Sequence, residues 1–447
     1  GQSRHFSLSS GAEPTEIAAA APVDPNLKVL VKHSLSGESA ELEFRLLTVA
    51  GKEGLTAEMW SSGVRLGRRA MGDKIGAAVL LGNIFGKPQF SPSGRRVAWI
   101  AERPDGRAKV GGYWPPPKES DKDDDKGEGK EKGKEAGTAD ASTDKAKEEP
   151  SPFGKFELRR TLGETLGNPG SVLVLWDWAT DELTVHDVGP LLPPGTLGPR
   201  EVAVPAQLQF DGTDDGVIFG CHLLPARLPG LSACLNRRAG LFHYGLGASS
   251  ARCLTDGLYC AMMPRLSPDG ASLAFVAVPQ PFGSHSTNVE VRCMEWPAAD
   301  GGAGASSRVV VPKVAGTVRH GEGFAGFCGF HPQLDGLGWL GGLTTAGDAG
   351  TSLVFPTINS AELTVYACED ASATPADAPP SAAGPRQLRP PGWERGSVEL
   401  LASGIGAVVV QCSALNRPPQ VWACFPGGAG AGGGDAWRML TDASDAS

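Results

Sequence analysis

Three segments of this sequence share one pattern, in which an apolar residue is followed by a turn and then by an apolar stretch. The pattern occurs at residues 90–94 (FSPSG) and 266–270 (LSPDG), with a degenerate copy at residues 210–216 (FDGTDDG). Proline presets φ at the second position of such a turn, and glycine adopts the positive φ that closes it. A turn and strand that recur along one chain indicate a repeat architecture.

Between these turns the sequence reads as short β-strands. The 61 glycines and 36 prolines make up more than a fifth of the 447 residues, which disfavours helices and favours turns. Apolar runs predict strands at residues 97–100, 171–178, 183–185, 217–219, 273–276, 353–355, 363–366, 407–410 and 421–422. Many short strands at regular spacing are typical of a sandwich, a barrel or a propeller.

The repeat favours the propeller among these three folds. The copies that start at residues 210 and 266 are spaced slightly more widely than the roughly 40–50 residues of a four-stranded blade. A Leu-Thr-Asp ending also recurs, at residues 254–256 and 440–442, and is common in propellers of peptidases and of the bacterial Tol system. We therefore predict an all-β fold, a β-propeller of seven four-stranded blades.

One charged segment interrupts this pattern. Residues 118–149 contain eight Lys and twelve Asp or Glu and almost no apolar side chains. Such a segment buries too little surface to offset its chain entropy, so we predict a disordered charged insertion over residues 115–152. Strand-like sequence resumes at Phe156, which places the insertion inside a folded unit.

Composition argues against several classes of protein. The formal net charge of -9 disfavours nucleic-acid binding, and no apolar run approaches the roughly 20 residues that span a bilayer. The nine cysteines form no Cys-x-x-Cys pair and lie at no zinc-binding spacing, so we expect no metal and no cofactor. Reduced thiols favour a cytoplasmic protein. Because the first residue is Gly, we expect a fragment or a processed chain, from which an organellar targeting peptide could be missing.

A family resemblance lies in residues 234–241 (CLNRRAGL), which resemble the Cys-x-Asn-Arg-Arg-x-x-Leu segment of eukaryotic acylaminoacyl peptidases. Further strings similar to that family come in the same order, over roughly residues 80 to 425. They are residues 156–176, 210–220, 264–269 (PRLSPD) and 323–328 (GFAGFC).

The resemblance implies the N-terminal β-propeller domain of an acylaminoacyl peptidase (acylamino-acid-releasing enzyme, prolyl oligopeptidase family). In that family a seven-bladed propeller precedes a C-terminal α/β-hydrolase domain, a serine peptidase that removes N-acylated amino acids from short blocked peptides. The propeller covers the active site and restricts access to it. Members are often oligomeric, so a homo-oligomer is possible.

The catalytic signature of that hydrolase is absent from this sequence. No Gly-x-Ser-x-Gly motif occurs, and residues 283–286 (GSHS), which come nearest, lack the closing Gly. Residues 320–323 (HGEG) read as a loop within the propeller. We therefore predict no catalytic residue in this chain. Arg237 and Arg238 are the candidate substrate-binding residues, because guanidinium groups bind carboxylates in bidentate fashion, although they could equally stabilise blade packing or face solvent.

Together these observations predict a domain organisation and a function. Residues 1–25 form a loose N-terminal segment, residues 26–442 the β-propeller domain, and residues 443–447 a tail at the expected junction to a hydrolase domain. The predicted function is non-catalytic: the propeller gates access of short N-acylated peptides to that domain. The alternative is a free-standing propeller that acts as a protein-interaction scaffold. A periplasmic propeller of the Tol type is a weaker third hypothesis.

Overall fold

The computed structural model describes the chain in segments, and nearly every regular element in them is a β-strand. The described residues are 5–7, 15–17, 27–36, 41–49, 54–76, 80, 84–104, 170–225, 231, 236–281, 288–297, 307–314, 323–329, 334–340, 352–359, 361–368, 384–404, 406–425 and 435–441. The predicted insertion at residues 115–152 and the tail at residues 443–447 lie outside them, so these domain boundaries stay predictions.

The strands pair in chain order as antiparallel four-stranded sheets. The first sheet is β3 (Leu27–Ser36), β4 (Glu41–Val49), β5 (Thr56–Ser61) and β6 (Val64–Ala70). The second is β7 (Gln89–Phe90), β8 (Arg96–Glu102), β9 (Ser171–Asp177) and β10 (Glu182–His186). The third is β11 (Glu201–Phe210), β12 (Gly216–Pro225), β13 (Ala239–Gly245) and β14 (Arg252–Cys253).

Three more sheets of the same order complete the described part. The fourth is β15 (Cys260–Leu266), β16 (Ser272–Val278), β17 (Asn288–Glu295) and β18 (Arg308–Val311). The fifth is β20 (Gly338–Leu340), β21 (Ser352–Asn359), β22 (Glu362–Cys368) and β23 (Arg386–Leu388). The sixth is β24 (Ser397–Gly404), β25 (Ala407–Ala414), β26 (Arg417–Phe425) and β27 (Ala436–Met439).

The remaining elements are short. Strand β1 (His5–Ser7) pairs with β2 (Thr15–Ile17), and β19 (Phe327–Cys328) pairs with β17. Two 3-10 turns, η1 (Gly72–Lys74) and η3 (Gly189–Leu191), lie in the connections. One parallel bridge, between Ala239 and Cys260, links the third sheet to the fourth.

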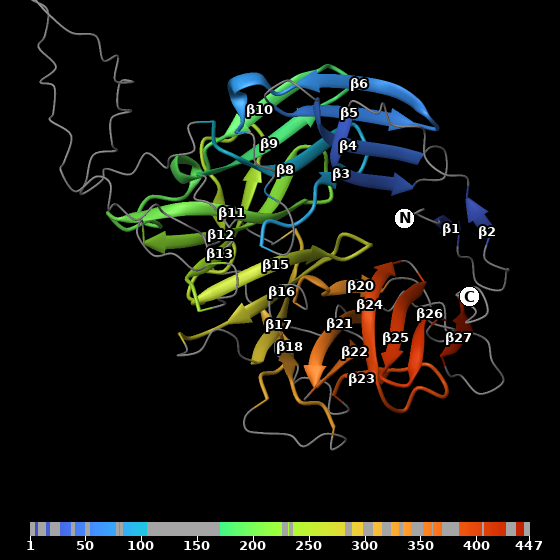
Figure 1. The fold of residues 1–447 in the computed structure, drawn as a ribbon. Coiled ribbons are helices and arrows are strands. Elements are labelled where there is room, and N and C mark those ends of the chain that lie inside the picture. The colour runs from blue at the N-terminus through green and yellow to red at the C-terminus, as the bar shows by residue number, and fades with distance from the viewer. Residues whose placement is uncertain are drawn as a thin grey trace, which may run out of the picture.

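The sheets follow one another around a common centre, as the change from blue through green and yellow to red shows (Figure 1). The first strands of neighbouring sheets contact each other, β7 with β11, β11 with β15, β15 with β20 and β20 with β24. Successive four-stranded meanders arranged in this way form a β-propeller, which confirms the predicted fold class. Through that parallel bridge the third and fourth sheets, with β19, form one nine-stranded sheet. Divided at the bridge, the described strands form six four-stranded units, and the predicted count of seven stays a prediction.

The recurring turn has the predicted geometry and adds a serine acceptor. Gly94 and Gly270 have φ values of 74° and 70°, in the region that glycine tolerates best. In both copies the glycine N–H donates to the carbonyl oxygen of the turn serine, Ser91 or Ser267, at 2.8 and 2.9 Å. The same serine Oγ accepts the N–H of the first residue of the next strand, at 3.1 and 2.9 Å.

The hydrophobic core lies between neighbouring sheets. Phe44 of the first sheet packs against Trp99 of the second, with ring centroids 5.2 Å apart, and against Trp176 at 6.3 Å. All three side chains are almost completely buried. Burying aromatic surface between sheets supplies the cohesion that hydrogen bonds within each sheet do not.

Candidate functional site

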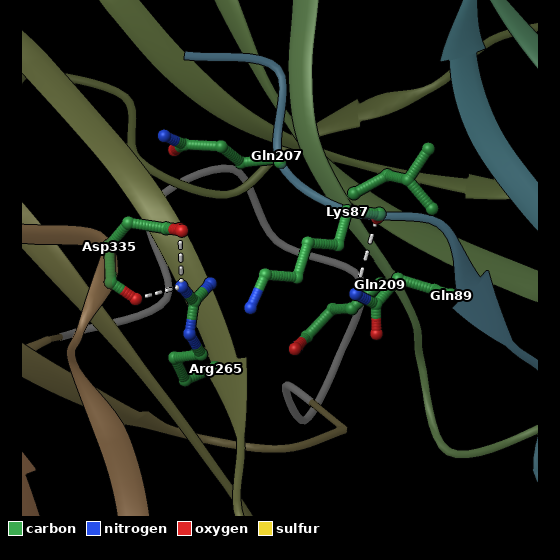
Figure 2. Close-up of a pocket in the computed structure, with 8 residues that line it drawn as sticks. Lys87, Gln89, Gln207, Gln209, Arg265 and Asp335 are labelled. Atoms are coloured by element: carbon green, nitrogen blue, oxygen red, sulfur yellow. Dashed lines mark hydrogen bonds and ion pairs between the residues drawn. The ribbon is translucent and has the colours of Figure 1, made fainter. Parts of the chain in front are cut away.

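The centre of the ring contains a polar cavity of about 230 Å³. Its lining comes from β7 and the residues just before it, from β11 and β15, and from the segment that precedes β20 in the fifth sheet, shown in Figure 2. The lining residues are Gly86, Lys87, Gln89, Gln207, Leu208, Gln209, Arg265 and Asp335. Because propellers bind ligands where their innermost strands converge, this cavity is the candidate site.

Two bulges shape the wall of the cavity. The pairing register shifts between Ala206 and Gln209 in β11 and between Met262 and Arg265 in β15. Within these bulges Gln207 and Met263 have positive φ values of 48° and 58°. Non-glycine residues in this region store strain, which concentrates at functional sites.

The two bulges are held together by glutamine side chains. Gln207 Oε1 accepts the Met263 N–H at 2.8 Å, and Gln209 Oε1 accepts the Leu266 N–H at 3.1 Å. The side-chain oxygens of these two β11 glutamines therefore accept hydrogen bonds from backbone N–H groups of β15. The Nε2 of Gln209 is buried without a hydrogen-bond partner among the described residues.

Gly86 fits closely against the first bulge. It has a φ of 80°, and a Cβ built on it would lie 3.1 Å from the Cα of Gln207. The Gln207 N–H also donates to the Phe85 carbonyl oxygen at 2.9 Å. The segment before β7 therefore supports the strained residue of β11 from the neighbouring sheet.

Arg265 closes the other side of the cavity. Its Nη2 donates to the carbonyl oxygen and to Oδ1 of Asp335, each at 2.8 Å (Figure 2). Its Nε donates to the Leu337 carbonyl oxygen at 2.8 Å. The Arg265 carbonyl oxygen in turn accepts the Trp339 indole N–H at 2.7 Å. These bonds fix the arginine and neutralise its charge.

Lys87 is the remaining charged group of the lining. Its side chain is exposed and extends into the space between Arg265 and Gln209 in Figure 2. No ion pair joins it to any of the residues that the structure describes. Among the described lining residues, the charge that is not neutralised is therefore positive.

The two candidate residues from the sequence lie elsewhere. Arg238 donates from Nη1 to Glu201 Oε2 at 2.9 Å and from Nη2 to the Thr196 carbonyl oxygen at 3.0 Å. Arg237 donates to the Asn236 carbonyl oxygen at 2.7 Å. Both precede β13, a third strand of its sheet, and neither lines the cavity. Substrate binding by Arg237 and Arg238 stays a prediction.

The residues that line the cavity are not among the candidate site residues that the sequence motifs indicate. One signal was present, because Gln207 and Gln209 alternate within the otherwise apolar stretch at residues 206–210 (AQLQF). Two polar residues at a spacing of two lie on one face of a strand. A polar face on a buried strand suggests an internal cavity.

A second polar pair lies at the turn of the third sheet. His243 Nε2 and Asp211 Oδ2 are 2.8 Å apart, and Asp211 Oδ1 accepts the N–H of Thr213 at 2.9 Å. Burial favours the neutral acid, but the hydrogen bonds from His243 and Thr213 outweigh it and lower the pKa of Asp211. The Trp296 indole N–H donates to the Asp211 carbonyl oxygen at 2.8 Å, which ties the fourth sheet to this turn.

The described residues lack two further features. No group of three or more His, Cys, Asp or Glu side chains among them is arranged to hold a metal ion. None of the helices in the described part of the chain has the length and apolar character needed to cross a membrane.

The sheet order and the central cavity define the class of protein, an all-β propeller with a polar centre. Comparison with curated proteins then gives a match to the acylamino-acid-releasing enzyme of Rattus norvegicus, 35% identical over 83 residues. This match confirms the predicted resemblance to acylaminoacyl peptidases over that stretch. It covers 18% of this chain and 11% of that enzyme. No protein-family model matches the sequence.

Several solved structures are similar to this chain at low sequence identity. They are dipeptidyl peptidase 4 of Porphyromonas gingivalis (TM-score 0.43, 9% identical, 93% of this chain and 50% of that chain) and prolyl oligopeptidase B of Galerina marginata (TM-score 0.45, 7% identical, 97% of this chain and 46% of that chain). TolB of Acinetobacter baumannii is 10% identical, with a TM-score of 0.33 over 97% of this chain and 86% of that chain. The chain thus spans about half the length of the two peptidases.

Proposed function

We propose that this chain is the propeller portion of a serine peptidase of the acylaminoacyl type. The observation that carries the proposal is the 35% identity over 83 residues to an acylamino-acid-releasing enzyme. The sheet order is consistent with it, because the described strands form a propeller with a polar cavity at its centre.

In this proposal the chain has no catalytic group of its own. Hydrolysis is performed by a Ser-Asp-His triad on a C-terminal α/β-hydrolase domain, which the propeller covers. The ring acts by exclusion, since a narrow passage admits short N-acylated peptides and keeps folded proteins out. A cytoplasmic location and a homo-oligomeric state belong to the same proposal.

The mass and the activity of the native polypeptide test this proposal. Immunoblotting against this region, with peptide mapping of the C-terminus, measures the mass of the protein in its own cells. We expect a band heavier than 46.3 kDa by the mass of one hydrolase domain. The immunoprecipitated protein should release N-acetylalanine from a blocked peptide. The 447-residue chain alone should remain unlabelled by a fluorophosphonate probe.

The opposite result has an equally definite meaning. A native band at the mass of this chain, without hydrolase peptides and without peptidase activity in the immunoprecipitate, would refute the proposal. The scaffold hypothesis would then take its place.

A further inference from the structure

We propose that the central cavity binds the free carboxylate end of a short peptide, with Lys87 as its charged contact. The inference rests on the proposed function in one respect, that peptides are the molecules that reach the cavity. It adds a substrate class, because peptides with a free carboxyl end are bound in preference to peptides with a blocked one.

The charges of the lining support an anionic ligand. The lining contains two cationic side chains, Lys87 and Arg265, and one carboxylate, Asp335. Arg265 and Asp335 form an ion pair at 2.8 Å and neutralise each other, and Arg265 also donates hydrogen bonds to the carbonyl oxygens of Leu337 and Pro264. Lys87 is left without an ion pair among the described residues, so a ligand carboxylate is its natural counter-ion.

The hydrogen-bonding groups of the wall agree with this charge. The Oε1 atoms of Gln207 and Gln209 are taken by the backbone N–H groups of Met263 and Leu266. The Gln209 Nε2 keeps its donors, because no described residue accepts from it. A ligand oxygen that accepts from this amide would satisfy a buried donor that is otherwise unpaired.

The wall is also held in place before any ligand arrives. The bulges at Gln207 and Met263 bond to each other, Gly86 packs against the Gln207 backbone, and Arg265 is fixed by the segment before β20. A preorganised site loses little entropy on binding. The volume of about 230 Å³ leaves room for several water molecules of roughly 30 Å³ each, or for the terminal residue of a peptide in their place.

The experiment compares two probes that differ only at the carboxyl end. Dansyl-Ala-Ala with a free carboxylate and dansyl-Ala-Ala-amide are titrated with the 447-residue chain, and fluorescence anisotropy reports binding. We expect the acid to bind about threefold to fivefold more tightly than the amide, as one ion pair with an exposed lysine would give. The preference should weaken as salt is added.

Four variants assign the preference to the cavity. Lys87→Met should abolish it, and Lys87→Arg should retain it. Gln209→Glu keeps an oxygen that accepts the Leu266 N–H but replaces the free amide donor with a negative charge. It should therefore bind the acid probe more weakly than the unaltered chain does. Lys313→Met removes the same charge from an exposed residue outside the lining, and should behave as the unaltered chain. Circular dichroism confirms that each variant is folded.

Equal binding of acid and amide by the unaltered chain, binding of neither probe, or an undiminished preference in Lys87→Met would overturn the inference. These results leave the proposed function standing, because it is decided by the mass and activity of the native polypeptide. A native protein without a hydrolase domain, together with a Lys87-dependent preference, would refute the proposed function and keep the carboxylate site.

Discussion

Asp211 occupies the turn position that serine holds in the two regular copies of the repeat. Its N–H donates to the Gly216 carbonyl oxygen at 3.0 Å, as Ser91 donates to Arg96 and Ser267 to Ser272. The Asp211 side chain leaves no space for a Cβ at position 216, because Asp211 Oδ2 would lie 1.9 Å from a Cβ built on Gly216. The replacement of serine by aspartate in this copy is therefore accompanied by a glycine at the start of β12 and by a new hydrogen-bond partner of the side chain, His243.

We expect the Asp211 pair to contribute stability that depends on pH. Because the folded pKa of Asp211 is lowered, its contribution is present above the unfolded pKa and is lost as pH falls through the folded value. Asp211→Asn should reduce the free energy of unfolding by about 1–3 kcal/mol at pH 7 and by less at acid pH. Urea denaturation at several pH values measures both.

Glu394→Gln is the control for this prediction, because Glu394 is exposed. It should leave the pH profile unchanged. An equal loss for Asp211→Asn at neutral and acid pH would mean that the carboxylate charge does not contribute.

The cysteine thiols should react slowly in the folded chain. Burial raises the pKa of Cys412 to about 11 and the pKa of Cys293 and Cys424 to about 12. Thiolate is the reactive form, so these thiols are protected by both low access and low ionisation. Mass spectrometry after alkylation should find them modified only in denaturant, and rapid modification of Cys412 in the folded chain would contradict this.

At the scale of single elements, the turn serine is more than a spacer. Ser267 is 3% exposed, and its Oγ accepts the Ser272 N–H at the start of β16. Ser267→Ala leaves that donor buried and unpaired, so we expect a loss of about 1–3 kcal/mol in the free energy of unfolding. Ser250→Ala, at an exposed turn position, should cost far less in the same thermal or urea measurement.

The strands and turns could be predicted because their signals are local. The stretches at residues 97–100, 273–276 and 407–410 alternate or are uniformly apolar between turn residues, and each lies within an observed strand. The cavity could not be predicted in the same way. Gln209 and Arg265 lie in the third and fourth sheets, and Lys87 lies just before the first strand of the second. The bulges that shape the cavity depend on register between strands, which no local pattern encodes.

At the scale of the whole molecule, packing between sheets decides whether the ring holds together. Trp99 is buried between the first and second sheets, and its indole N–H has no partner among the described residues. Trp99→Ala removes the contact with Phe44 and should lower the free energy of unfolding by about 3–5 kcal/mol. Trp99→Phe keeps an aromatic ring and removes the unpaired donor, so it should cost much less.

Thermal unfolding followed by circular dichroism compares these two variants. If Trp99→Phe destabilised the chain as strongly as Trp99→Ala, then the indole itself, rather than the aromatic packing, would be essential.

Each described four-stranded sheet consists of strands that are consecutive in the chain. During synthesis on a ribosome, the N-terminal part of a polypeptide folds before the rest has emerged. A chain with this order can complete one sheet after another and leaves few strand edges exposed to other molecules. The second sheet differs, because β8 must wait until residues 103–170 have been made before β9 can pair with it. The second sheet is therefore where a nascent chain would most need a chaperone.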